Sequence, residues 1–304
     1  MKNIFQIFSL IFIVSLTSCD EDFFQSTVAI ELPEHVAQLT VSGTMTHGAE
    51  EVGFYISSSK SLNDSGNLEE YPDAKVSLFK DNILLASPIF NPATLLHEAT
   101  VDSTAFESGS TYRLEVEQEG FETITSEQKM PKQVVIEGFK FEEQGTFDDF
   151  GEPADAVTIE FTDDPNEENY YLIEGISSFS YFNGVDTIRD RYPTELGSID
   201  PNVVRGYIAE YQSAPMISDA TFNGKKYQMN MYSYSSFFGG GDDENFITVY
   251  LRSITRERYL YLLSLDRFYQ SQGDLFAEPV TVAGNIQNGL GSFGAQTLDS
   301  LIIR

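Results

Sequence analysis

The stretch Thr111-Tyr112-Arg113-Leu114-Glu115-Val116-Glu117 alternates polar and apolar side chains at every step. Side chains of an extended chain point alternately to its two faces, so the apolar ones share one face and the charged ones share the other. This period indicates a β-strand that buries one face. Ala74, Val76 and Leu78 repeat the same period.

Similar short runs fill the chain from residue 28 to residue 131, with turn signals such as Asp81-Asn82 and Glu119-Gly120 between them. Asn and Gly tolerate the positive φ that tight hairpin turns require. No long helical period interrupts these runs. About seven short strands at regular spacing predict an antiparallel, immunoglobulin-like β-sandwich over residues 28–131.

The alternation breaks at Lys129-Met130-Pro131-Lys132, which places a domain boundary near residue 131. Strand patterns then return in four segments, at residues 157–161, 170–176, 227–234 and 246–251. The sequence therefore predicts a mainly β protein, in which residues 132–304 form a second, β-rich domain.

One long helix is expected over residues 255–272. Thr255 can cap its start, Gly273 can end it, and apolar residues recur between them at helical spacing. The helix is apolar on two faces, because Leu260 and Leu263 lie opposite the main stripe. A helix of this kind is normally covered on both faces, so we expect it to lie against the sheet beneath another layer.

Residues 183–222 form a long insertion with weak periodicity that contains Pro193, Pro201 and Pro215. Long irregular segments in compact domains often form binding loops or mobile lids. A disordered surface excursion would have the same composition. Both interpretations stay open on the sequence alone.

The N-terminus has the form of a secretory signal. Lys2 gives a positive start, residues 4–16 are apolar, and Leu16-Thr17-Ser18-Cys19 closes the run with small residues before a thiol. The apolar run is shorter than the roughly 20 residues that a membrane-spanning helix needs. We therefore expect residues 1–18 to be a lipoprotein signal peptide, and the mature chain to begin at a lipidated Cys19.

Cys19 is the only cysteine, so it can form no internal disulfide. Burial as a structural thiol is disfavoured, because the adjacent Asp20, Glu21 and Asp22 would lose their hydration. Two or three acyl chains would anchor the protein firmly, since each buried methylene contributes about 0.8 kcal/mol. Residues 19–27 are then an acidic tether, and a lipid bilayer is the first expected partner.

Acidic residues outnumber basic residues by 29. Such a chain repels phosphates, so we expect no nucleic-acid partner. The chain has no Trp, which disfavours a Trp-based sugar platform, although Tyr can also stack on a sugar ring. His35, His47 and His97 are the only histidines, which leaves the last two thirds of the chain with none for a catalytic triad or a zinc site.

The most metal-like cluster is Asp163-Asp164-Pro165-Asn166-Glu167-Glu168-Asn169. Ca²⁺ takes hard oxygen ligands, and Asp163, Asp164, Asn166 and Glu168 could supply them. The spacing matches no defined calcium loop, and in so acidic a chain a solvated turn is the simpler explanation. Residues 239–245 allow the same two interpretations. A phosphate loop is excluded there, because acids stand where a phosphate needs amides and a lysine.

Catalytic motifs are missing from the sequence. It contains neither a Gly-x-Ser-x-Gly elbow nor a His-Glu-x-x-His motif, and Cys19 is committed to lipid. A pair of carboxylates could act as a glycosidase acid and base, but their abundance alone does not indicate one. We therefore expect a non-catalytic protein without a cofactor.

The C-terminal part carries a family resemblance. Its motifs are Arg258-Tyr259-Leu260-Tyr261-Leu262, Phe276-Ala277-Glu278-Pro279-Val280 and Asn285-Ile286-Gln287-Asn288-Gly289-Leu290-Gly291-Ser292-Phe293-Gly294. They resemble the closing signature of the family catalogued as domain of unknown function 4249. Residues 30–34, 39–43 and 169–172 resemble the opening and central strands of that family.

This resemblance implies an outer-membrane lipoprotein of Bacteroidota, often encoded beside a TonB-dependent transporter, with no assigned catalytic residues. Asp20-Glu21-Asp22 resembles the export signal of surface lipoproteins, which implies that the protein faces the cell exterior; the same trio is also typical of a solvated tether. The glycines of the last motif, with Asn285 and Asn288, would form a structural clasp between sheet and helix or would contact a ligand.

Together these observations lead us to expect a surface-exposed outer-membrane lipoprotein. Its expected role is that of a non-catalytic binding or docking accessory of a TonB-dependent transporter. Two alternatives belong to other classes. One is a structural or adhesive envelope lipoprotein, and the other is a carboxylate-based hydrolase.

Overall fold

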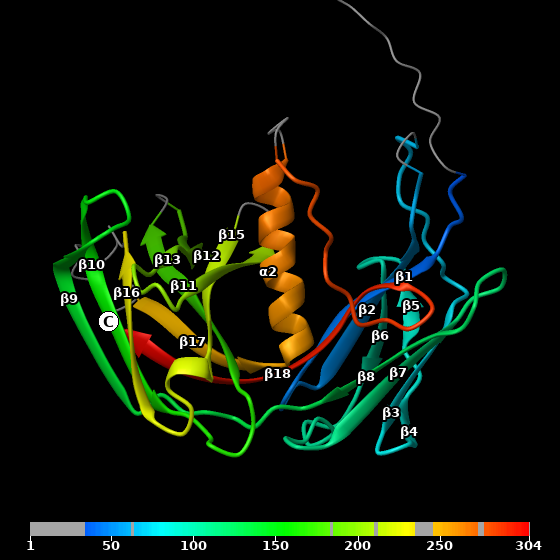
Figure 1. Cartoon of the computed structure of the whole chain (residues 1–304), viewed down its shortest axis with the longest axis horizontal. Helices are drawn as coiled ribbons and strands as arrows, with labels where there is room; N and C mark the ends of the chain where they lie inside the picture. The colour runs from blue at the N-terminus through cyan, green and yellow to red at the C-terminus, as the bar shows by residue number, and fades with distance from the viewer. Residues whose placement is uncertain are drawn as a thin grey trace, which may run out of the picture. The chain divides into compact units, whose positions relative to one another are not determined.

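The computed structural model describes residues 34–61, 64–182, 185–209, 212–234, 246–272 and 277–303. Residues 37–304 form one compact unit, and residues 1–36 form another, of which only 34–36 are described. The described part of the larger unit is mainly β with one long helix, which confirms the predicted class (Figure 1).

Three sheets make up this unit. A ten-stranded sheet, the large sheet, has the order β14-β15-β11-β17-β18-β1-β2-β6-β5, with β12 added beside β11. The second and third sheets have the orders β4-β3-β7-β8 and β13-β16-β10-β9. The bounds of the strands in the first half of the chain are β1 Leu39–Thr46, β2 Glu51–Ser58, β3 Lys75–Lys80, β4 Ile83–Ala86, β5 Ile89–Asn91, β6 Leu96–Thr100, β7 Thr111–Glu117 and β8 Ile124–Lys129. Those of the second half are β9 Gly138–Phe147, β10 Pro153–Thr162, β11 Tyr170–Phe182, β12 Thr187–Thr194, β13 Leu196–Gly197, β14 Val204–Ala209, β15 Gln212–Ser218, β16 Lys226–Ser233, β17 Phe246–Ile254 and β18 Leu290–Ile303.

The first hydrophobic core lies between the β3–β7 sheet and the part of the large sheet that holds β1 and β2. In β7 the buried and half-buried residues alternate strictly, as the sequence predicts. Tyr112 is fully buried at the end of this stripe, and its hydroxyl donates to the Ala105 carbonyl at 2.8 Å. The immunoglobulin-like connectivity of this region stays a prediction.

The second core lies between the β10–β16 sheet and strands β11, β17 and β18 of the large sheet. Its centre is aromatic: the Phe161 and Tyr171 rings lie 4.7 Å apart, and the Phe222 and Tyr227 rings stack at 4.1 Å. These pairs bury large apolar surfaces, and aromatic contacts add to the stabilisation from burial.

Strand β18 belongs to both cores. It pairs in parallel with β1, with Thr40 opposite Leu290, and antiparallel with β17. Phe293 and Ala295 lie in the first core, whereas Ile303 lies in the second. The predicted boundary near residue 131 falls between β8 and β9. Strand β18 follows this boundary in the sequence but pairs with β1, which precedes it.

The predicted helix is α2, Arg256–Ser271, which agrees with the expected range 255–272 to within one residue at each end. Thr255 is the N-cap by backbone conformation, but its side chain makes no capping hydrogen bond. Leu262 packs on Leu172 and Ile254 of the large sheet. The helix also contacts β14, and Ser264 accepts a hydrogen bond from the Ala283 N–H. Leu262 and Asp266 are its buried residues, so the expected second covering layer stays a prediction. None of the described helices is long and apolar enough to cross a membrane.

The insertion 183–222 is more regular than expected. Its described residues form β12, β13, β14, β15 and a short 3-10 helix, η2 (Asp219–Thr221). The sequence did not predict these strands, because proline lacks the backbone N–H of a strand ladder and is therefore usually taken to interrupt strands. Pro193 lies in β12, whose one strand partner is β11, so the missing N–H breaks no inner ladder. The prediction of an irregular segment is therefore wrong for this region.

Candidate functional site

The predicted lipidation and export residues lie outside the described residues. Cys19, Asp20, Glu21 and Asp22 are all among residues 1–33. Residues 235–245, which include the whole acidic glycine-rich segment 239–245, also lie outside them. The lipid anchor and the export signal therefore stay predictions.

The candidate calcium ligands lie in the turn between β10 and β11, where donors of the protein itself occupy their oxygens. Asp163 is 2% exposed, and it accepts the Tyr171 hydroxyl at 2.5 Å and the Gly224 N–H at 2.8 Å. Glu168 accepts the Tyr170 hydroxyl at 3.1 Å. Among the described residues, no three His, Cys, Asp or Glu side chains converge as a metal site.

Asp164 is held by a cation instead. The Lys132 ammonium lies 2.5 Å from its carboxylate, and Asn166 donates to it through both its backbone N–H and its side-chain amide. These donors, Lys132 first, lower the pKa of Asp164 to about 2. The Asp164 side chain is therefore ionised at neutral pH, and groups of the protein itself already donate to it.

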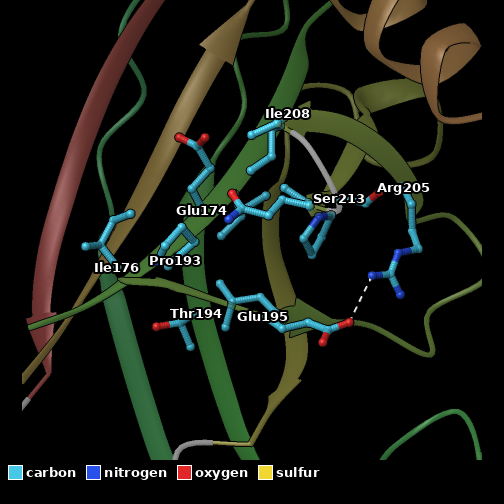
Figure 2. A pocket seen from close by; sticks show the side chains of 15 residues that line it. Glu174, Ile176, Pro193, Thr194, Glu195, Arg205, Ile208 and Ser213 are labelled. Atoms are coloured by element: carbon cyan, nitrogen blue, oxygen red, sulfur yellow. Dashed lines mark hydrogen bonds and ion pairs between the residues drawn. The ribbon is translucent and has the colours of Figure 1, made fainter. Parts of the chain in front are cut away.

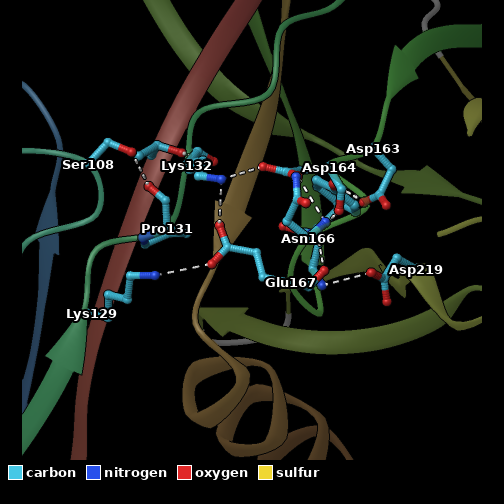
Figure 3. Close-up of polar contacts among 12 residues, drawn as sticks. Ser108, Lys129, Pro131, Lys132, Asp163, Asp164, Asn166, Glu167 and Asp219 are labelled. Carbon is cyan, nitrogen blue, oxygen red and sulfur yellow. Dashed lines mark hydrogen bonds and ion pairs between the residues drawn. The ribbon is translucent and has the colours of Figure 1, made fainter. Parts of the chain in front are cut away.

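The turn contacts the end of β8, the segment that follows β8, and η2 (Figure 3). Lys129, the last residue of β8, and Lys132 lie 3.2 and 3.6 Å from Glu167. Asn169 and Asp219 exchange two hydrogen bonds of 3.0 Å, which join the turn to η2. Burial, followed by the nearby Asp163 charge, raises the pKa of Asp219. This arrangement has the contacts of a structural junction.

A partly enclosed hollow among the described residues lies where the large sheet forks. β11 pairs with β15 through Tyr170–Leu172 and with β12 from Gly175 onward, on the same edge. Ile173 and Glu174 have no strand partner there, and the two neighbouring strands separate. The resulting cavity, the fork pocket, has a volume of about 220 Å³. A gap of this kind leaves backbone polar groups to be satisfied by water or a ligand.

The fork pocket combines an apolar lining with charged side chains at its rim (Figure 2). Glu195 and Arg205 form an ion pair at 3.1 Å, and Glu174 pairs with Arg252. The apolar lining residues are Ile173, Ile176, Pro193, Leu196, Ile208, Ala209, Ala214 and Pro215. Small-molecule sites typically have such a composition, with few polar groups to orient a ligand in an apolar cavity.

Two hydroxyl side chains, those of Thr194 and Ser213, line the pocket. The Ser213 hydroxyl donates to the Asp266 carboxylate at 2.5 Å. His47 contacts the Phe106 carbonyl, and His97 is buried beside Phe90 in the first half of the chain. Burial lowers the pKa of His97, and nearby carbonyls act in the opposite direction.

Sequence analysis did not single out Glu174, Glu195 or Arg205. The length of the insertion 183–222 indicated that this region could hold a binding site, but it did not indicate which side chains would form the site. The three residues meet because β11 changes partners, and that change depends on pairing with distant strands.

The glycine motif near the C-terminus forms a clasp. Asn285 donates to the Phe293 carbonyl at 2.7 Å and accepts the Phe293 N–H at 2.9 Å, as a neighbouring strand would. Gly291 has φ +110°, and a Cβ there would lie 2.0 Å from the Val41 carbonyl oxygen. Gly294 lies against Arg258 of α2. The motif therefore has structural contacts, which extend to β1 as well as to the helix.

Residues 25–301 match the family model described as "Domain of unknown function (DUF4249)", which confirms the resemblance found in the sequence. The chain matches no curated protein. Among solved structures it is similar to one described as "Putative membrane anchored protein from Corynebacterium diphtheriae", at 10% identity and a TM-score of 0.21. The match covers 71% of this chain and 54% of that one, so the chain spans about half of its length.

Proposed function

Because the chain belongs to the family of domain of unknown function 4249, whose model matches residues 25–301, we propose that it is a lipid-anchored protein of the outer membrane that faces the cell exterior. Leu16-Thr17-Ser18-Cys19 is the observation that carries this proposal. An apolar run that ends in small residues and a lone cysteine is suited to signal cleavage and acylation.

In this proposal the protein works as a non-catalytic binding or docking accessory of a TonB-dependent transporter. The fork pocket supports a binding role, since its cavity of about 220 Å³ has an apolar lining and paired charges at its rim. The large acidic excess supports a role outside the cell that needs no contact with nucleic acid.

The anchor is tested by mass spectrometry of the protein isolated from membranes. We expect a mature N-terminus at Cys19 that carries acyl chains, and we expect Cys19→Ser to leave the chain uncleaved or released from the membrane. Ser26→Ala is the matched control in the tether and should retain the lipid. An unmodified thiol in the wild-type protein would refute the anchor.

The orientation is tested by protease treatment of intact cells. A protein on the outer face should be digested, whereas a variant with Asp20→Asn, Glu21→Gln and Asp22→Asn should be protected if these charges direct export. Digestion of both proteins to the same extent would assign the trio to the tether alone.

The transporter is tested by affinity purification of the native complex from detergent-solubilised envelopes. Recovery of a TonB-dependent transporter in stoichiometric amount supports docking. Recovery without any transporter, together with normal nutrient uptake and altered surface attachment in a deletion strain, would favour the structural or adhesive alternative.

One observation bears on the hydrolase alternative, because Glu174 and Glu195 line the same pocket. Each is already paired with an arginine of the protein itself. A glycosidase needs both carboxyl groups to act on its substrate, so this pair suits ligand orientation better than acid catalysis.

A further inference from the structure

A second hollow lies between the β14–β15 hairpin and the C-terminal half of α2. It has a volume of about 840 Å³, and we call it the helix groove. The side chains that define it are Tyr207, Gln212, Asp266, Tyr269, Gln270 and Gln272. Arg205, Gln212 and Ser213 line both this groove and the fork pocket.

One wall of the helix groove is aromatic. The rings of Tyr207 and Tyr269 stack with their centroids 4.3 Å apart and their planes 19° apart. Tyr207 comes from β14 and Tyr269 from α2, so the stack fixes the hairpin against the helix. Tyr269 nevertheless remains 45% exposed, so part of its surface is open to a ligand.

The floor of the groove is polar and rigid. Asp266 is 6% exposed and accepts the Ser213 hydroxyl and the Gln270 amide, both at 2.5 Å. These two bonds satisfy the buried carboxylate and hold both donors in place. Each amide side chain in the groove offers donors and an acceptor, so Gln212, Gln270 and Gln272 can pair with either kind of ligand group.

The charge of the groove differs from that of the chain. Acidic residues exceed basic residues by 29 in the whole sequence, but the described side chains that line the groove include one acid, Asp266, and one base, Arg205. These described side chains offer a strongly charged ligand no excess of opposite charge. A neutral ligand rich in hydroxyl groups would find an aromatic face, several amides and a guanidinium.

We propose that the helix groove binds a neutral saccharide. A pyranose ring has an apolar C–H face that can pack on Tyr269, and its hydroxyls can pair with the amides and with Arg205. This site goes beyond the docking function proposed above and does not depend on it, because purified protein without any transporter should bind the sugar.

The test uses the full-length lipidated protein in a detergent without a sugar headgroup. Maltotriose, cellotriose, xylotriose and chitotriose are titrated to about 5 mM, with saturation-transfer NMR and tyrosine fluorescence as readouts, because the chain has no Trp. We expect at least one of them to bind with a Kd below about 1 mM. Tyr269→Ala should weaken that binding about 5- to 10-fold, because the stacking surface is lost.

Tyr192→Ala is the matched control. Tyr192 is 53% exposed and stacks on Phe179 at 5.3 Å, but it lies on β12 outside the groove, so its loss should leave the affinity unchanged. Circular dichroism checks that both variants are folded. Lack of binding by all four sugars, or equal affinity in the wild type and in Tyr269→Ala, would overturn the proposal.

Discussion

At the residue scale, tyrosine hydroxyls hold several carboxylates of this acidic chain. The sequence has 47 acidic residues against 18 Lys and Arg, so most carboxylates cannot have a cation of their own. A phenolic O–H satisfies a carboxylate without one. The pairs are Tyr171–Asp163 at 2.5 Å, Tyr227–Asp200 at 2.6 Å and Tyr232–Asp149 at 3.0 Å.

These pairs predict a loss of stability at alkaline pH. Burial and the bond to Asp149 raise the pKa of Tyr232 from 10.0 to about 12. A group with a raised folded-state pKa contributes stability that is complete below the unfolded pKa and is lost as the pH rises through the folded one. We therefore expect the urea midpoint to fall between about pH 10 and pH 12.

Tyr232→Phe should flatten this fall, because the variant has no proton to lose at this position. Tyr192→Phe, at an exposed tyrosine, is the control and should follow the wild type. An unchanged slope in Tyr232→Phe would show that other groups cause the alkaline loss.

Gly291 gives a second prediction at this scale. Its φ of +110° disfavours any side chain, and a Cβ would collide with the Val41 carbonyl. We expect Gly291→Ala to lower the free energy of unfolding by at least about 3 kcal/mol in urea titrations. Gly109→Ala, at φ +84° with nothing within 4 Å, should cost only about 1–2 kcal/mol. Similar losses in both variants would rule out the clash.

At the scale of elements, the sequence predicted the features that depend on neighbouring residues, and it did not predict which distant strands pair. Helix α2 was predicted to within one residue at each end, because helical spacing and a cap are local features. Strands β12–β15 were not predicted. Prolines make their sequences resemble irregular segments, and they form strands because they pair with neighbouring strands. The fork pocket was missed for the same reason, since it exists where β11 exchanges one partner for another.

The segment before β18 provides a prediction at this scale. The Asn285 side chain bonds to both backbone groups of Phe293, which is fully buried. Asn285→Ala should therefore lower the free energy of unfolding by about 1–3 kcal/mol, because both groups lose a partner. Asn202→Ala, at an exposed asparagine bonded to Asp200, should stay within about 0.5 kcal/mol of the wild type. Equal effects would assign Asn285 no role in the clasp.

At the scale of the larger unit, β18 makes the two cores depend on each other. Phe293 is fully buried in the first core, and the same strand carries Ile303 into the second. We expect Phe293→Ala to cost about 3–5 kcal/mol and to speed hydrogen exchange in β10 and β16 as well as in β3 and β7.

Ile302→Ala is the control on the same strand, because Ile302 is 51% exposed, and its effect should be small in both regions. Faster exchange restricted to β3 and β7 would show that the two cores unfold independently.

The sequence by itself determined the mainly β class, the position of the helix and the family, because alternation, helical spacing and short motifs are carried by neighbouring residues. It also singled out the residues of the expected lipid anchor. Only the tertiary structure decided that Leu290 lies beside Thr40, that the large sheet forks at Ile173, and that Tyr207 stacks on Tyr269. These features depend on contacts between residues far apart in the chain. A local sequence pattern does not predict which of the many apolar strands pair with one another.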